Sequence, residues 1–378
     1  MTNRETAPPP RPPLPDDRVF VLFACCQPVR GARRSVVCDL ERQTYRFIPN
    51  GLYEILTEQV GRTLPEIRAA YDHEFDAEID EYFAFLLDNE FGFFTDEPER
   101  FPPLDLTFDA PERISNAIVD VDARSDHDFA KLCRELDGLA CKALELRCFA
   151  PLPLAQVALM LQPTERGRLR SVDLLLAWSD ETTDAALDAL VRANARISSV
   201  TVHSAPEARA REVGRRVPLT YVEQAIDSPR CCGQVHPATF RVNGELFLEA
   251  QRHNSCLSRK ISVDARGEIR NCPSLRESYG NARTTPLAEA LAQPGFATLG
   301  RIAKDQVAVC RDCEFRYICT DCRAYVRDPA DLFSKPAKCS YDPYTAEWQP
   351  PVDRPDALPV PSAAAAPEAV AAGLHNEE

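Results

Sequence analysis

Long uncharged apolar runs are missing from this 378-residue sequence. No stretch of about 18 residues is both apolar and free of charge, so no segment is expected to span a membrane. The first residues, MTNRETAPPPRPPLPDD, hold prolines and acids where a signal peptide needs a basic end followed by an apolar stretch. We therefore expect a protein that stays in the cytoplasm.

An excess of positive charge is also missing. The chain has 44 lysines and arginines against 58 aspartates and glutamates, which gives a formal net charge of -14. Binding to nucleic acid is driven largely by lysine and arginine side chains that replace counterions. The composition therefore argues against a nucleic acid as the main partner.

Familiar catalytic motifs are absent from the sequence as well. We find no Ser-His-Asp pattern, no phosphate-binding glycine loop and no H-E-x-x-H helix. His236 lies near a Cys-Cys pair, but a solvent-facing loop histidine is the simpler interpretation. The sequence names no catalytic residue.

Cysteine, by contrast, is abundant, with 15 residues. A reducing cytosol disfavours disulfides, so clustered thiols there indicate metal binding or catalysis. Six of the cysteines lack the spacing of ligands and are expected to be small core residues: Cys25, Cys26, Cys38, Cys133, Cys141 and Cys148.

The length predicts two or three domains, flanked by proline-rich ends. Residues 1–17 and 350–378 are expected to be disordered. Between them the pattern changes near residues 97 to 110 and again near residue 228. These changes divide the chain into three segments, 18–97, 110–228 and 229–349.

Residues 18–97 predict three short strands, three helices and a closing strand. The strands are the apolar segments VFVLFACC, RRSVVCDL and RQTYRFIP. Asn50 is expected to cap the first helix, and Thr63 with Glu66 fits a capping box for the second. The third helix has one apolar face, formed by Ile79, Tyr82, Phe83, Leu86 and Leu87.

Residues 110–228 alternate between strands and helices of about ten residues. The strands are NAIVDVD, KALELRCF, SVDLLLAW and SSVTVHSA. Such alternation implies right-handed crossovers and a parallel sheet. We expect an α/β sheet or a partial (β/α) barrel.

Residues 229–349 carry seven cysteines with regular spacing. Cys256 and Cys272 flank Gly267, which fits a hairpin turn of positive φ that returns the second thiol to the first. A four-cysteine run and a last single cysteine follow, at Cys310, Cys313, Cys319, Cys322 and Cys339. Short CxxC loops supply two thiolates from one turn, and distant cysteines complete a set of four. Iron-sulfur clusters are the favoured interpretation, and two four-cysteine zinc sites are the alternative.

This spacing resembles the SPASM domain of peptide-modifying enzymes. The resemblance implies that Cys310, Cys313, Cys319 and Cys339 hold one [4Fe-4S] cluster, while Cys256, Cys272 and Cys322 share another. The second cluster then lacks a fourth ligand, for which Cys232 or Cys231 is nearest in sequence; otherwise one iron keeps an open site. The family usually has three residues before the last cysteine of the run, whereas this chain has two, Thr320 and Asp321.

The order of elements in residues 18–97 resembles the PqqD-like domain that binds leader peptides. In that family the leader adds a strand to the sheet edge, which here corresponds to residues 43–48. A winged-helix fold with a purely structural role is the alternative. The implied fold class is a multidomain α/β protein with a winged-helix-like recognition domain, a degenerate partial (β/α) barrel and a cysteine-rich SPASM domain.

The strings CGQVHPATFRVN, CRDCEFRYICTDCRAY and KCSYDPYTAEW resemble the grasp-with-spasm SPASM-domain peptide maturases. That resemblance implies a precursor peptide and an ATP-grasp ligase as partners. The C-x3-C-x2-C loop of radical S-adenosylmethionine enzymes is absent after NAIVDVD, so cleavage of S-adenosylmethionine is not expected. Two hypotheses follow, a maturation enzyme or redox subunit and a non-catalytic adaptor that presents the peptide.

Overall fold

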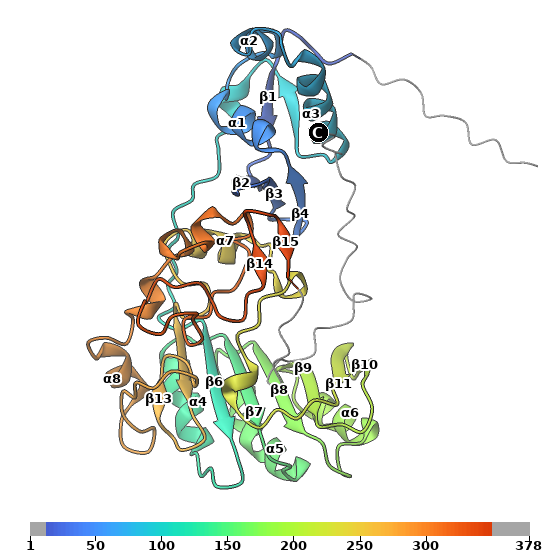
Figure 1. Ribbon diagram of the computed structural model, residues 1–378. Helices are drawn as coiled ribbons and strands as arrows, with labels where there is room; N and C mark the ends of the chain where they lie inside the picture. Colours follow the sequence, from blue (N-terminus) through green and yellow to red (C-terminus); the bar gives the residue numbers. More distant parts are fainter. Residues whose placement is uncertain (1–12, 350–378) are drawn as a thin grey trace, which may run out of the picture.

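A computed structural model describes residues 13–349 as three stacked parts. Figure 1 shows the N-terminal strands and helices at one end, a large sheet at the other, and most of the cysteine-rich segment between them. Disorder was expected for residues 1–17 and 350–378, of which residues 1–12 and 350–378 lie outside the described residues. Leu14 instead packs against the N-terminal core, and Asp16 pairs with Arg68 at 3.2 Å. No helix within residues 13–349 is long and apolar enough to cross a membrane.

The N-terminal part contains two small sheets instead of one. Strand β1 (Val19–Leu22) pairs with β5 (Gly92–Thr95), whereas β2 (Cys26–Val29), β3 (Ser35–Asp39) and β4 (Thr44–Ile48) form a separate antiparallel sheet. The segment VFVLFACC was expected to be one strand, and that expectation is wrong. The chain turns tightly at Phe23, whose carbonyl accepts the Cys26 N–H at 2.8 Å, so the segment is divided between the two sheets.

Three helices follow, as the sequence predicts: α1 (Asn50–Glu58), α2 (Leu64–Ala70) and α3 (Asp76–Asp88). The Thr63–Glu66 capping box is confirmed, and α3 buries Ile79, Phe83 and Leu86. The predicted cap at Asn50 is wrong, because Pro49 precedes the helix. The Asn50 side chain instead accepts a hydrogen bond from Ser35 and donates to the carbonyls of the adjacent turn.

A mixed eight-stranded sheet with a parallel centre forms the other end of the molecule, in the order β10-β11-β9-β8-β7-β6-β12-β13. Its parallel strands are β6 (Asn116–Val121), β7 (Ala143–Cys148), β8 (Ser171–Ala177), β9 (Ile197–His203), β11 (Val217–Tyr221) and β12 (Lys260–Val263). The edge strands β10 (Arg209–Val213) and β13 (Ile269–Arg270) pair antiparallel. The sheet is open, because these two edges do not pair with each other.

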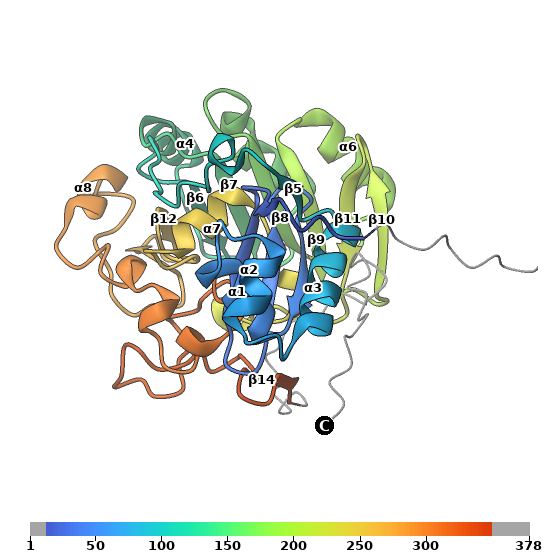
Figure 2. The ribbon, with the colours of Figure 1, turned by 90° about the horizontal axis from the view of Figure 1, so that it is seen from above.

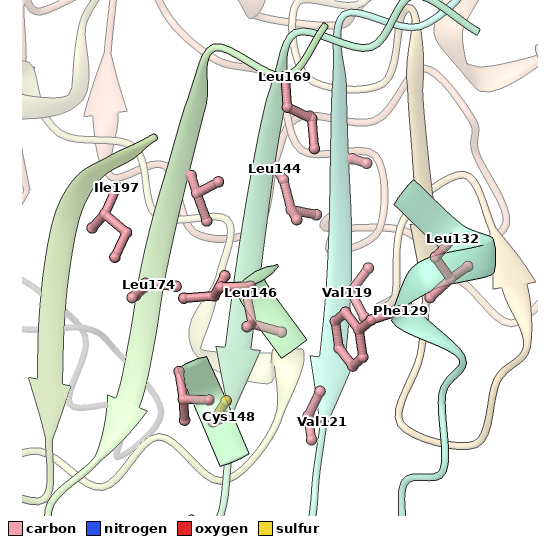
Figure 3. Packing of buried hydrophobic residues seen from close by; sticks show 14 of the residues in the cluster. Val119, Val121, Phe129, Leu132, Leu144, Leu146, Cys148, Leu169, Leu174 and Ile197 are labelled. Atoms are coloured by element: carbon pink, nitrogen blue, oxygen red, sulfur yellow. The ribbon is translucent and has the colours of Figure 1, made fainter. Parts of the chain in front are cut away.

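The crossover helices α4 (Phe129–Gly138), α5 (Leu154–Leu161) and α6 (Asp184–Ala193) pack on one face of this sheet. Alternate strand residues such as Val119, Leu144 and Leu146 meet Phe129 and Leu132 of α4 in the main core (Figure 3). Cys133, Cys141 and Cys148 are buried in this part of the molecule, as expected of core cysteines. The sequence periodicity therefore predicted this layer correctly.

Residues 229–349 contain little regular structure. Their helices are α7 (Gly244–Ala250) and α8 (Leu287–Ala292), and a short hairpin joins β14 (Tyr341–Asp342) to β15 (Glu347–Trp348). The β12–β13 hairpin of this segment extends the central sheet beside β6. The view along the stack shows α1, α2 and α3 over this segment and the sheet (Figure 2).

The face of the sheet opposite the crossover helices carries charged side chains. Asp120 of β6 and Arg147 of β7 are 1% and 4% exposed and form a bidentate ion pair, with N···O distances of 2.6 and 2.9 Å. Burial raises the pKa of Asp120 to about 6, although the Arg147 guanidinium opposes the shift. The pair fixes two neighbouring strands below the cysteine-rich segment.

Replacing Asp120 by Asn should lower the free energy of unfolding by about 3–5 kcal/mol, because Arg147 would remain buried without its counterion. Asp120→Leu combined with Arg147→Met should recover most of that loss, since both charges are then removed. Urea unfolding followed by circular dichroism measures these differences. The exposed pair of Asp126 and Arg283 provides the control, and Asp126→Asn should change the stability far less.

Candidate metal centre

Eight cysteines from distant segments converge in two groups, each of four thiols. Thiol set A contains Cys232, Cys256, Cys272 and Cys322, and thiol set B contains Cys310, Cys313, Cys319 and Cys339. In set A, Cys256 lies close enough to three other thiols for their charges to interact, namely those of Cys232, Cys272 and Cys322. The four thiols of set B line a single pocket.

The β12–β13 hairpin brings two thiols of set A together. Cys256 precedes β12 and Cys272 follows β13, and Gly267 occupies the turn with φ of 87°. The Gly267 N–H donates to the Asp264 carbonyl at 2.8 Å, which closes the turn. The hairpin and the positive φ of its glycine are as the sequence predicts.

A close approach between two loops adds Cys232 and Cys322 to set A. Gly233 has a φ of 90°, and a Cβ atom at this position would lie 2.8 Å from the Cys322 sulfur. Only glycine therefore lets the Cys232 loop reach Cys322. Sequence reasoning placed Cys322 with Cys256 and Cys272, and left the fourth member open between Cys232 and Cys231.

A buried polar pair that the sequence did not reveal holds the two loops of set A. Asn254, which is fully buried, accepts hydrogen bonds from the N–H groups of Cys256 and Leu257 at 3.0 and 2.8 Å. Its amide donates to Asp321 at 2.6 Å, one residue before Cys322. Asp321 also accepts from Arg323 at 2.7 Å. No periodicity or motif marks these residues in the sequence.

Set B is built by the short helical turn at residues 310–312 and the loops around it. Cys310 lies within electrostatic range of Cys319 and Cys339, and Cys313 within range of Cys319. Burial raises the pKa of Cys310 to about 12 and shifts the pKa of Cys313 in the same direction. Four thiols around one pocket, two of them buried and two half-buried, can hold a cation that accepts them as thiolates.

The spacing of the thiols bears on the kind of metal. A Zn–S bond of about 2.3 Å in a tetrahedral site puts the four sulfurs roughly 3.8 Å apart. Within residues 13–349, the only three potential ligand atoms that all lie within 4.8 Å of one another belong to Cys25, Cys26 and Asp39. No three thiols of set A or of set B within residues 13–349 lie that close together. A single zinc ion bound by four of these thiols would draw them closer together than they lie here.

Each thiol set has a lysine beside it, the half-buried Lys260 at set A and the buried Lys304 at set B. Lys260 Nζ donates to Cys256 Sγ at 3.4 Å, and Lys304, which is 4% exposed, lines the pocket of set B. Burial by itself would lower the pKa of Lys260, but the charges of Cys256 and Cys272 raise it overall. Sequence reasoning missed both lysines, because lysine is not a ligand type and neither residue lies in a CxxC loop.

Set A lies over the charged face of the central sheet. Arg147 and Glu145 of β7 are within electrostatic range of Cys232, and Glu145 also acts on Lys260. The side chains of Leu144, Leu146 and Cys148 on the same strand are buried in the main core. The alternation of β7 thus directs its charged residues toward set A.

Set B shares a hydrophobic core with the N-terminal sheet. Val29, Val36 and Cys38 of β2 and β3 are buried with Phe315 and Ile318. Tyr45 and Phe47 of β4 meet Phe315 edge to face, with ring centroids 5.6 and 5.8 Å apart. The loop that carries Cys313 and Cys319 is therefore packed directly on the predicted recognition domain.

Polar contacts reinforce this junction. Glu314, which is 1% exposed, accepts hydrogen bonds from Arg34 at 2.9 Å and from Tyr341. The Ala32 N–H donates to the Asp312 carbonyl at 2.8 Å. A Cβ atom at Gly31 would lie 2.9 Å from the Glu314 side chain, so the close approach requires glycine there.

His236 takes part in a local turn. Its Nδ1 accepts a hydrogen bond from the Ala238 N–H at 3.2 Å, and its ring lies 6.0 Å from that of Trp348. These contacts account for the side chain without a metal.

Replacing Phe315 by Ala should lower the free energy of unfolding by about 3–5 kcal/mol, since the ring is 2% exposed and contacts aromatic residues from three segments. Thermal unfolding should then separate into two transitions, because the shared core is lost. Phe75, which is 49% exposed, gives the matched control, and Phe75→Ala should stay within about 0.5 kcal/mol of the parent. Equal effects of the two changes would contradict the shared core.

Comparison with known proteins gives a weak structural likeness. No protein-family model matches the chain, and no curated protein matches it. Two similar solved structures are crystal structures of Streptococcus suis SuiB, one of them bound to S-adenosylmethionine. Each is 8% identical in sequence and covers 82% of this chain and 95% of the SuiB chain, with TM-scores of 0.29 and 0.28.

Proposed function

We propose that this chain is an iron-sulfur protein that acts in the maturation of a ribosomally made peptide. The convergence of eight cysteines into thiol sets A and B carries the proposal. In each set the thiolates would hold one [4Fe-4S] cluster, and bound clusters would supply one-electron redox chemistry. The SPASM-like spacing of seven of these cysteines supports the same function.

Residues around each set hold the thiols in position. Asn254 fixes the turn at Cys256, and Gly233 lets two loops meet at Cys322. Phe315 and Trp348 cover set B, as both line its pocket. The two rings limit access of water to the sulfurs of set B, which would favour an intact cluster there.

A leader peptide is the ligand that we propose for the N-terminal part. Within residues 13–349, β4 pairs with β3 on one side and with no strand on the other. An extended peptide can add to such an edge through backbone hydrogen bonds. The PqqD-like order of elements supports this use of β4, and an ATP-grasp ligase is the partner implied by the resemblance to the maturases.

The alternative function is that of a non-catalytic adaptor, in which the clusters only stabilise the fold. One observation favours it: residues 122–128, DARSDHD, follow β6 and contain no cysteine. The chain therefore lacks the three-cysteine loop that radical cleavage of S-adenosylmethionine requires. In both functions we propose that this chain does not cleave S-adenosylmethionine.

Anaerobic purification with iron, sulfide and zinc counted per chain tests the metal assignment. We expect about eight irons per chain from two four-iron clusters. Electron paramagnetic resonance spectra of the reduced protein should not change when S-adenosylmethionine is added. Zinc without sulfide would overturn the iron-sulfur proposal.

Replacing Cys313 by Ala should remove about half of the iron and lower the melting temperature, because metal binding contributes to the folding free energy of a segment with little regular structure. The control is Cys141→Ala, which alters a buried core cysteine outside both sets. That variant should keep all of its iron. Full iron content in the Cys313 variant would show that the ligand assignment is wrong.

Strand addition at β4 predicts a periodic effect of N-methylation on leader binding. Alternate N–H groups of an added strand point toward its partner strand, so N-methyl groups on one alternating set of leader residues should weaken binding at least tenfold. The other set should bind nearly as the unmodified leader does. Fluorescence anisotropy with the full chain measures both peptides. Absence of binding, or equal loss in both, would exclude this edge as the site.

A further inference from the structure

Lys260 and Lys304 occupy equivalent positions beside the two thiol sets. Lys260 Nζ donates to Cys256 Sγ at 3.4 Å, and its neighbours also include Cys272 and Cys232. Lys304 interacts with Cys319 and Cys310 and donates to the Thr320 carbonyl at 3.4 Å. One lysine ammonium group thus lies beside each set of four sulfurs.

Thiols lie beside both lysines, and Glu145 of β7 also acts on Lys260. Among residues 13–349, the lysines in salt bridges with carboxylates are Lys131 with Glu135 and Lys142 with Glu112. Asp321 lies near Lys304, but its carboxylate is already hydrogen-bonded by Arg323 and Asn254. A buried ammonium group without a counterion is costly, so negative charge on the neighbouring sulfurs would stabilise the buried Lys304, and the hydrogen bond to Cys256 would do the same for the half-buried Lys260.

Charge near a cluster changes its reduction potential. A [4Fe-4S] cluster with four thiolate ligands carries net negative charge, and reduction adds one more negative charge. An ammonium group in a buried site stabilises the reduced form more than the oxidised form. A hydrogen bond to a ligand sulfur acts in the same direction, and both factors are known to tune cluster potentials.

We infer that Lys260 and Lys304 are positioning residues that raise the reduction potentials of two clusters, one lysine for each thiol set, so that both sites accept an electron reversibly. The inference rests on the proposed iron-sulfur function and deepens it toward electron transfer. In each reduction one electron enters from a low-potential donor of the ferredoxin or flavodoxin class. No bond forms or breaks, and no proton is taken up.

A redox titration of the anaerobically purified full chain, with dithionite as reductant and paramagnetic resonance as readout, tests this inference. Lys260→Met should make the midpoint potential of one cluster more negative by at least about 59 mV. For one electron this shift corresponds to a tenfold change in the equilibrium constant of reduction. Lys304→Met should move the other. The control Lys142→Met removes a lysine that pairs with Glu112 and should move neither.

Two further variants separate charge from structure and protect the test against loss of the cluster. Lys260→Arg keeps the positive charge, and Lys260→Gln keeps an N–H donor without it. The inference is supported when both variants keep the iron content of the parent, the Arg variant has a potential near that of the parent, and the Gln variant has a more negative one. Parent-like potentials in Met and Gln variants with full iron overturn it. Absence of iron from the parent protein would instead refute the proposed function.

Discussion

The sheet formed by β2, β3 and β4 is buried on both faces, and the arrangement of the molecule depends on it. One face, through Val37 and Ile48, packs on the helices of the N-terminal part. The other, through Val36 and Phe47, packs on the loop that carries the cysteines of set B. Because strand side chains alternate, three short strands supply both surfaces. The N-terminal part is therefore joined to the cysteine-rich segment by a common core.

The cysteine-rich segment is held at both ends. Above, set B packs against the N-terminal sheet through Phe315. Below, the β12–β13 hairpin joins the central sheet, and set A lies over its charged face. Only the two residues Thr320 and Asp321 separate Cys319 of set B from Cys322 of set A. The edge strand β4, the two thiol sets and the charged face of the sheet therefore belong to one connected body.

The buried polar groups of this segment distinguish a site for negative charge from an ordinary core. An apolar core would not retain Lys304, Asp321 and Glu314, each of which is at most 4% exposed. Glu314 and Asp321 are neutralised by arginines, Arg34 and Arg323. The lysines face sulfurs instead. Lys304, Glu314 and Asp321 thus lie beside the cysteines of set B, which are the proposed ligands.

The sequence by itself determined the crossover helices, the parallel strands of residues 116–203, the capping box at Thr63 and the hairpin turn at Gly267, because periodicity and turn chemistry are local properties. It also singled out seven cysteines by spacing and left the eighth open between Cys231 and Cys232. Only the tertiary structure decided that Cys232 approaches Cys322, that β12 joins the sheet beside β6, and that Lys260 and Lys304 face the sulfurs. These contacts join residues from different loops and segments, and no local pattern records which loops will meet.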